Sequence, residues 1–384
     1  MSQAMTGKQR VEATFEGRPV DRVPIYCAGL SCRIASHVLG REAYVGHGKQ
    51  QYRETVALWE GEMAHQEFVE RTRDDVLEVS ETLDLDLIRP SYWRYGHKPI
   101  ARIDENTFKF GDEDGDWWVM RFDPGTELYQ QIDRNPRPEP TIEDIRAQVQ
   151  REEQVGPGKP PPPENFPDLL GAIEYYGERR MVPGYGTGVG ILRERHWLEA
   201  MALEPELVAR HLMYVARRNT KTIETMKRMG LRVLLGGGDF AGKNGPLYSP
   251  KAFHQCMLPA LQVVSEACDQ HNCWHFFASD GNLWPVAEDL FGNSGVHGFY
   301  EIDRRCGMDL RRLRDTFPDL RLMGGISSET LHLGTPEDVR TETMDALRVA
   351  KERGKIMVGV SNQVVPLTPF ENFDMMIETL HENR

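Results

Sequence analysis

Eight short apolar runs recur along the chain, and the later ones alternate with stretches of helical periodicity. The clearest run is Trp274–Phe277, after which the chain turns polar at Ser279–Asn282. A parallel strand buried on both faces has a continuous apolar run rather than an alternating one. The recurrence therefore predicts a parallel sheet. The other seven predicted strands are Val23–Tyr26, Leu85–Ile88, Arg180–Pro183, Val233–Leu235, Gly298–Tyr300, Leu320–Met323 and Ile356–Val358.

Amphipathic stretches between the later runs indicate helices over Glu206–Met229, Ala252–Gln270 and Pro336–Arg353. Strands that alternate with helices through right-handed crossovers form parallel α/β sheets. Eight such units in 384 residues favour a closed (β/α)8 TIM barrel. A doubly wound open sheet is the alternative.

Two segments interrupt this rhythm. Residues 107–129 alternate around the turn Asp112–Gly115, which predicts a β-hairpin. Residues 150–166 form a Pro-rich insertion, which we expect to be stiff and exposed. We expect both to cover one mouth of the barrel, within a single domain over residues 1–384.

Composition and charge argue against several classes of function. The net charge is −13 and no basic run occurs, so a nucleic-acid surface is not expected. The apolar runs are too short to span a bilayer, and the first residues lack the apolar core of a signal peptide, which predicts a cytoplasmic protein without a membrane partner. The six cysteines form no CxxC pair, so they are predicted to be buried thiols rather than metal ligands.

Three acids follow predicted strands directly: Asp239, Asp280 and Glu301. In a barrel, the carboxyl ends of the strands converge on one cavity. Three neighbouring carboxylates repel one another, so at least one should keep its proton near neutral pH and act as a general acid. Alternatively, one or two of them cap helices or pair with arginines such as Arg304 and Arg305.

Further polar side chains at the same ends are predicted to bind substrate. They are Tyr26, Arg33, Tyr185, Ser279, Asn282, Ser361 and Asn362, with Arg89 nearby. Strand alternation places His275 on the face opposite Asp280, so His275 is expected in the strand–helix layer. Trp93, Trp117, Trp118 and Tyr185 could line an aromatic pocket, although core packing explains them equally well.

Several motifs then resemble the uroporphyrinogen decarboxylase superfamily, from about Thr6 to the C-terminus. They are Gly245–Pro250, Ser279–Asn282, Gly307–Leu310, Gly324–Ile326, Leu333–Val339 and Pro369–Asn372. The resemblance implies a (β/α)8 barrel, often dimeric, with one of two chemistries. One is decarboxylation of uroporphyrinogen without a cofactor. The other is methyl transfer to or from a corrinoid that a separate small protein carries.

The motifs also depart from the family's patterns. The decarboxylases bind their poly-anionic substrate through an arginine-rich loop, whereas Tyr26–Arg33 keeps only one arginine. Their histidine after the last strand corresponds to Asn362. The thiol-directed methyltransferases hold zinc at positions that are Ala278, Asp280 and Ser361 here, so zinc is not expected. An oxygen-rich metal site of Asp280, Glu301 and His275 is disfavoured because His275 is expected on the opposite face, so no metal-binding residue is predicted.

The resemblance therefore implies a corrinoid-dependent methyltransferase that acts on a small methylated oxygen, nitrogen or sulfur compound. Asp280 or Glu301 would protonate the leaving group, while Asn282, Asn362 and Tyr185 would orient the substrate. The corrinoid (cobalamin) would come from a separate carrier protein, because the chain has no D-x-H-x-x-G motif. The alternatives are a cofactor-free decarboxylase of uroporphyrinogen or a smaller carboxylate, and a non-catalytic barrel that binds a corrinoid or tetrapyrrole.

Overall fold

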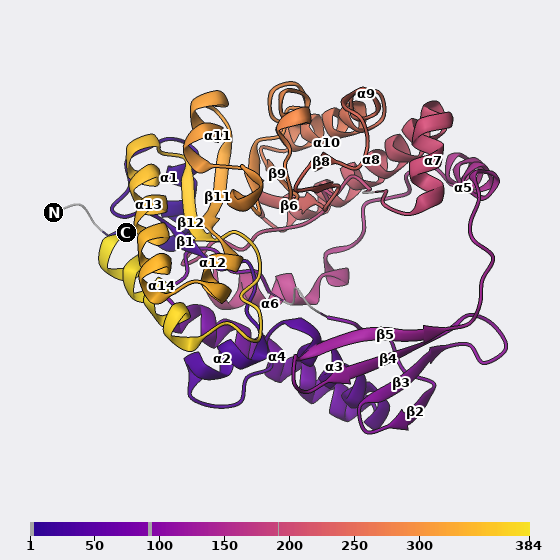
Figure 1. Cartoon of the computed structure of the whole chain (residues 1–384), viewed down its shortest axis with the longest axis horizontal. Coiled ribbons are helices and arrows are strands. Elements are labelled where there is room, and N and C mark those ends of the chain that lie inside the picture. The colour runs from indigo at the N-terminus through magenta and orange to yellow at the C-terminus, as the bar shows by residue number, and fades with distance from the viewer. Residues whose placement is uncertain (1–3, 91–93, 191) are drawn as a thin grey trace.

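The central element of the computed structural model is a curved parallel sheet within an α/β fold (Figure 1). The structure describes residues 4–90, 94–190 and 192–384. In spatial order the sheet contains β1 (Ile25–Tyr26), β12 (Ile356–Val360), β11 (Arg321–Ile326), β10 (Gly298–Tyr300), β9 (Trp274–Ala278) and β6 (Val233–Gly237). Every neighbouring pair is parallel, as the apolar runs predict.

The register aligns the carboxyl ends of these strands at one edge. Tyr300 of β10 lies opposite Ala278 of β9 and Met323 of β11, and Ala278 lies opposite Gly237 of β6. All five residues of β9 are buried, which explains why that strand has no polar alternation. The residues that follow β6, β9, β10 and β12 are therefore brought together.

Two further predicted strands pair with this sheet only through isolated bridges. Leu87 bridges to Tyr26 and to Met181, and Gly184 bridges to Leu234 of β6. The backbone N–H of Met181 donates to Asp86 at 2.9 Å, and that of Gly184 donates to Val233 at 2.8 Å. These contacts link β1 to β6 through two further parallel segments. All eight predicted segments therefore have a parallel neighbour.

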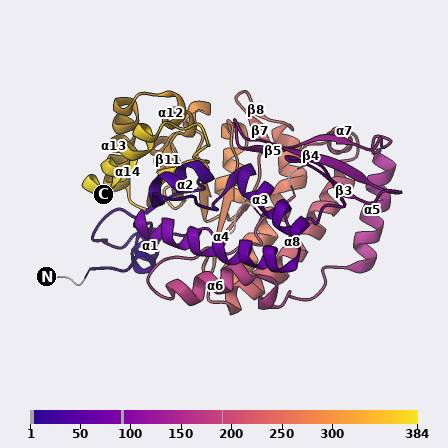
Figure 2. The ribbon, with the colours of Figure 1, turned by 90° about the horizontal axis from the view of Figure 1, so that it is seen from below.

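Helices pack around the sheet (Figures 1 and 2). They are α1 (Gly7–Phe15), α2 (Cys32–Leu39), α3 (His47–Glu60), α4 (Glu62–Thr82), α5 (Ile142–Val155), α6 (Pro167–Tyr176), α7 (Arg195–Leu203), α8 (Pro205–Arg228), α9 (Pro250–Ala252), α10 (Leu258–Gln270), α11 (Leu310–Thr316), α12 (Ser328–Leu333), α13 (Pro336–Arg353) and α14 (Phe370–Asn383). Figure 2 shows α4 and α6 on one side, where the hydroxyl of Tyr176 donates to the carbonyl of Leu77 at 2.7 Å.

One predicted helix has the expected bounds, and another is interrupted. Helix α13 has the predicted bounds, because Thr335 and Asp338 form a capping box and Gly354 follows its last turn. The predicted helix over Ala252–Gln270 is instead divided into α9, a π-helical turn at Phe253–Met257 and α10. Apolar periodicity does not distinguish a π-helical turn from an α-helical one.

The hairpin predicted around Asp112–Gly115 is confirmed, but it is the inner pair of a four-stranded antiparallel sheet. Its strands are β2 (Ala101–Asp104), β3 (Thr107–Gly111), β4 (Trp117–Asp123) and β5 (Leu128–Arg134), in that order. The outer strands β2 and β5 are mostly exposed, so they lack the apolar signal of the inner pair. Trp118 stacks on Phe110 in the small core of this sheet, and Trp93 lies outside the described residues.

The prediction for residues 150–166 also changes. Residues 150–155 are the last turns of α5, and a short 3-10 helix covers Pro163–Asn165. The hydroxyl of Thr225, near the end of α8, donates to the carbonyl of Pro161 at 2.5 Å. Because that end of α8 leads to the amino end of β6, the proline segment packs beside α8 rather than over the mouth.

The remaining expectations concern thiols and membranes. Five of the six cysteines are buried, and Cys306 is partly exposed. Within the described ranges, no helix combines the length and the apolar character needed to cross a bilayer.

Candidate functional site

The edge formed by the carboxyl ends of the strands brings four acids together. The backbone N–H of Asp280, just after β9, donates to Oδ1 of Asp239 at 2.9 Å. The next N–H, of Gly281, donates to Oδ2 of Asp303 at 3.2 Å. Asp280 therefore lies between two carboxylates that its own backbone turn holds in place, and Glu301 follows the adjacent strand β10.

Asp280 is an acid whose surroundings favour the protonated form. Burial raises the pKa of its carboxyl, and the charges of Asp239 and Asp303 raise it further, to about 7. The amide Nδ2 of Asn362 donates to Oδ2 of Asp280 at 2.6 Å and partly opposes this rise. At neutral pH this carboxyl can therefore hold or release a proton.

Glu301 is a second acid with similar behaviour in a more enclosed position. It is 8% exposed, and its backbone has a φ of +62°, a left-handed conformation that non-glycine residues rarely adopt. Burial raises its pKa to about 7. The guanidinium of Arg89 opposes that rise, and Asp280 and Asp239 add to it. The two acids thus influence each other's protonation.

Tyr26 of β1 completes this inner group. Its side chain is 2% exposed, and burial and the charge of Glu301 raise the pKa of its phenol. Its hydroxyl is buried and has no hydrogen-bond partner among the described residues. A buried hydroxyl without a partner is able to bind a polar group of a ligand.

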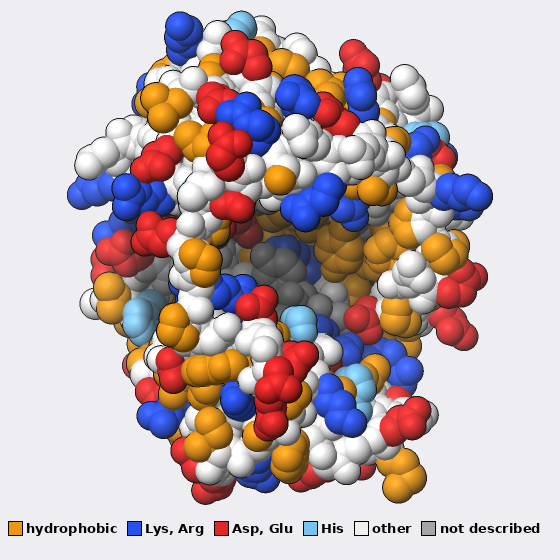
Figure 3. All heavy atoms as spheres, turned by 90° about the vertical axis from the view of Figure 1, so that its right-hand side faces the viewer, with side chains coloured by type: hydrophobic (Ala, Val, Ile, Leu, Met, Phe, Trp, Pro, Cys, Tyr) orange, Lys and Arg blue, Asp and Glu red, His pale blue; other side chains and the backbone are white. Residues whose placement is uncertain are grey.

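A cavity of about 390 Å³ opens beside Asp280. Its lining includes Asp280, Asn362 and Ser361 but, among the described residues, not Glu301. Of the two acids with raised pKa values, Asp280 is therefore the one that a ligand in this cavity would contact, and Asp303 and Glu329 also line it. Figure 3 shows a broad hollow on the face of the molecule that carries the β2–β5 sheet and the helices α5 and α7.

Comparison with protein-family models finds the uroporphyrinogen decarboxylase (URO-D) family over residues 189–383, just over half of the chain. The chain belongs to the uroporphyrinogen decarboxylase family. No curated protein matches it.

Solved structures resemble this family member in fold. A methyltransferase from Methanosarcina mazei has a TM-score of 0.65 and 17% sequence identity, and the match covers 98% of this chain and 99% of that one. A sugar phosphate isomerase/epimerase from Parabacteroides distasonis has a TM-score of 0.35 and 10% identity, covering 82% and 88% of the two chains. The first likeness supports the α/β fold, and the second is too distant to support an argument.

Several predicted substrate residues have local partners in this family member. The guanidinium of Arg33 donates to the carbonyls of Pro366 and Thr368 at 2.8 and 3.0 Å and lies 4.1 Å from the centre of the Phe370 ring. These contacts hold Arg33 against the loop before α14. The hydroxyl of Tyr185 donates to the carbonyl of Pro90 at 3.2 Å.

The serines and Asn282 shape the turns around the acids. The hydroxyl of Ser279 donates to the carbonyl of Asp280 at 2.9 Å, and that of Ser361 accepts from the N–H of Gly325 at 3.0 Å. The Oδ1 of Asn282 accepts from the N–H of Trp284 at 3.1 Å. Their roles as substrate contacts stay predictions.

His275 lies where strand alternation predicts. Its Nδ1 is 2.9 Å from the hydroxyl of Ser265 on α10, in the strand–helix layer, and it is fully buried. Burial lowers the pKa of its imidazole to about 3, so it stays neutral. The prediction that His275 lies in the strand–helix layer is confirmed, and its structural role stays a prediction.

The donors at the proposed zinc positions do not suit that metal. Ala278 has no ligating atom, Ser361 accepts a backbone N–H, and Asp280 accepts from Asn362. Across the described ranges, no group of three or more His, Cys, Asp or Glu side chains is arranged to hold a metal ion. That the reaction proceeds without zinc stays a prediction.

Sequence reasoning missed the cavity residues His47, Ile302, Glu329 and Val365. It gave Arg304 and Arg305 only as alternative partners of the acids. His47 begins α3, and a search of strand ends does not place a loop between two helices. Arg304 pairs instead with Asp345 at 3.1 Å and Arg305 with Glu329 at 3.0 Å. Arg304 and Arg305 therefore pair with other carboxylates, and the arginine that acts on Glu301 is Arg89.

Proposed function

We propose that this protein is a methyltransferase that moves a methyl group between a small methylated oxygen, nitrogen or sulfur compound and a corrinoid carried by a separate protein. The observation that carries the proposal is the pair of neighbouring acids, the partly buried Asp280 and the buried Glu301, whose carboxyl pKa values are both raised to about 7. We also infer that the eight parallel segments form a closed (β/α)8 barrel within one domain.

The chemistry requires an acid at this place. An oxygen or nitrogen atom leaves a methyl group slowly unless it gains a proton or a Lewis acid as the bond breaks. In our proposal, protonated Asp280 donates to the departing heteroatom while its bond to the methyl carbon breaks, and Asp280 is left ionised. Glu301 then provides a second protonation site within the same coupled group.

A bound corrinoid would supply the cobalt(I) nucleophile that accepts the methyl group. The broad hollow seen in Figure 3 offers room for a protein partner to approach beside the sheet β2–β5. Within the chain, Asn362 holds the carboxyl of Asp280 through its amide, and Asp239 and Asp303 anchor the turn on which Asp280 lies.

The decarboxylase alternative retains the support of the family match. Uroporphyrinogen carries eight carboxylates, which need cationic partners on the protein. The guanidinium of Arg33 instead donates to two backbone carbonyls. This favours methyl transfer over decarboxylation of that substrate.

The experiment supplies free cob(I)alamin and a panel of small methylated oxygen, nitrogen and sulfur compounds, and follows methyl transfer by absorbance. We expect transfer from at least one compound and a slower rate for Asp280→Asn. Full rates in both Asp280→Asn and Glu301→Gln would show that neither acid takes part. Formation of coproporphyrinogen from uroporphyrinogen would favour the decarboxylase, and corrinoid binding without turnover would favour a non-catalytic barrel.

A further inference from the structure

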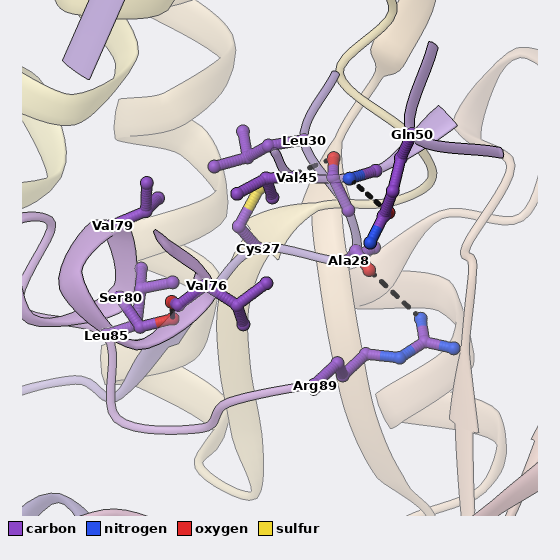
Figure 4. Close-up of a pocket in the computed structure, with 12 residues that line it drawn as sticks. Cys27, Ala28, Leu30, Val45, Gln50, Val76, Val79, Ser80, Leu85 and Arg89 are labelled. Atoms are coloured by element: carbon purple, nitrogen blue, oxygen red, sulfur yellow. Dashed lines mark hydrogen bonds between the residues drawn. The ribbon is translucent and has the colours of Figure 1, made fainter. Parts of the chain in front are cut away.

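A second cavity, of about 50 Å³, lies behind the loop that follows β1 (Figure 4). Its walls come from Cys27–Leu30, from the start of α3 and from α4. Among the described residues, it shares no lining residue with the cavity beside Asp280. The two cavities are therefore separate sites.

This cavity has an apolar end and a polar end. In Figure 4, Val76, Val79 and Leu85 lie on one side of Ala28, and Gln50 and the guanidinium of Arg89 lie on the other. A pocket divided in this way suits a molecule with a hydrocarbon end and one polar group.

Gln50 is the feature that indicates a ligand. It is 1% exposed, and its Oε1 accepts from the N–H of Gly46 at 2.6 Å. Its Nε2 is buried and meets no acceptor in the part of the chain that the structure describes. Buried donors are nearly always paired in folded proteins, so this amide calls for an acceptor within the cavity.

The other polar atoms of the lining are donors or are already used. The Nη1 of Arg89 donates to the carbonyl of Ala28 at 3.3 Å. The hydroxyl of Ser80 donates to the carbonyl of Val76 at 2.7 Å, within its own helix. The polar end thus presents donors and a positive charge, which select an anionic acceptor.

We propose that this cavity binds a short-chain monocarboxylate of the size of acetate or propionate, with the carboxylate on Gln50 and Arg89 and the carbon end against Val76 and Val79. One water needs about 10–15 Å³ of such space, so the cavity suits about three to five heavy atoms. The site lies next to the acids, because Arg89 also acts electrostatically on Glu301. The proposal does not depend on methyl transfer.

The test titrates the full chain with sodium acetate and sodium propionate at constant ionic strength and follows saturable binding by calorimetry and ligand-observed NMR. We expect one site per chain, with at least tenfold weaker binding of acetamide, which lacks the charge, and of benzoate, which is too large. Absence of saturable acetate binding, or equal affinity for acetamide, would overturn the proposal.

Matched variants locate the binding. Gln50→Glu keeps the acceptor for Gly46 and replaces the donor by a carboxylate oxygen, so acetate affinity should fall at least tenfold. Ser80→Ala removes a hydroxyl of the same lining that is used inside its helix, and the affinity should change less than twofold. If Gln50→Glu does not fold, Gln50→Leu makes the same test. Wild-type affinity in whichever Gln50 variant folds would show that the ligand does not bind here.

Discussion

Acids at the two ends of the parallel strands have opposite electrostatic surroundings. At the amino end, Asp86 is fully buried and accepts from Arg10 at 2.5 Å and from Arg384 at 3.4 Å. Arg10 also binds Asp21 and holds the pKa of that carboxyl at about 2. These carboxylates are paired with cations, and their role is structural.

At the carboxyl end, the neighbours of Asp280 are other acids. Burial raises the pKa of both Asp86 and Asp280, but arginines oppose the rise at Asp86 while carboxylates add to it at Asp280. The comparison teaches that burial alone does not make an acid reactive. The charges around an acid oppose or add to the effect of burial on its pKa.

The largest effect should follow removal of the reactive acid. Asp280→Asn keeps the shape of the side chain but cannot donate the proton, so methyl transfer to cob(I)alamin should slow by about 10²–10⁴-fold. The rate is measured at pH 6.5, with substrate binding followed separately. Asp309→Asn, at a helix N-cap away from the cavity, is the control and should keep the wild-type rate.

Substitutions at the amino end of the strands, where the acids are paired with arginines, should change the stability of the fold rather than the reaction rate. Arg10→Met leaves Asp86 buried with much less compensation, and unfolding in urea should show a loss of about 3–5 kcal/mol. The control is Arg22→Met, because Arg22 and Asp84 are 36% and 40% exposed and such pairs contribute less than about 1 kcal/mol. Equal losses in the two variants would contradict the comparison.

The raised pKa of Asp280 should make the folded protein less stable at high pH. Because the pKa of Asp280 in the folded chain is raised to about 7 from 3.8, its contribution to stability is present below pH 4 and is lost as the pH rises through 7. Asp280→Asn does not titrate, so its stability relative to wild type should increase between pH 5 and pH 8, by about 2 kcal/mol. Thermal unfolding across this range measures it, and a difference independent of pH would refute the raised pKa.

The smallest effect should come from Asn362, which tunes the acid. Its amide stabilises the ionised form of Asp280, so Asn362→Ala should raise the pKa of that carboxyl further. The limb of the pH–rate profile on which activity declines should move upward by about one pH unit. A lower rate at every pH, without a shift of the declining limb, would instead indicate that Asn362 contacts substrate.

The sequence predicted where the three acids lie, because their positions follow from topology. Asp239, Asp280 and Glu301 each follow an apolar run, and parallel register brings such positions to one edge. The same reasoning placed His275 on the opposite face. Asn362 was predicted near the acids, but its hydrogen bond to Asp280 depends on side-chain geometry that no pattern shows.

Features that depend on loops or on exposed strands were harder to predict. The strands β2 and β5 have little apolar alternation, so only the inner hairpin was evident. Gln50 lies near the start of α3, and no strand-end argument places it beside Arg89. Its buried amide became visible only when the packing of α3 and α4 against the loop after β1 was known.

The bridge between Leu87 and Met181 has a consequence for folding. It joins the two ends of an excursion over residues 88–180, which contains the β2–β5 sheet and α5. Closing a loop of that length costs about 4 kcal/mol beyond a constant, and doubling its length would add only about 0.6 kcal/mol. The fold can therefore accept a long and variable excursion here at little thermodynamic cost, whereas the distant contact at its base should form late and slow the folding of the chain.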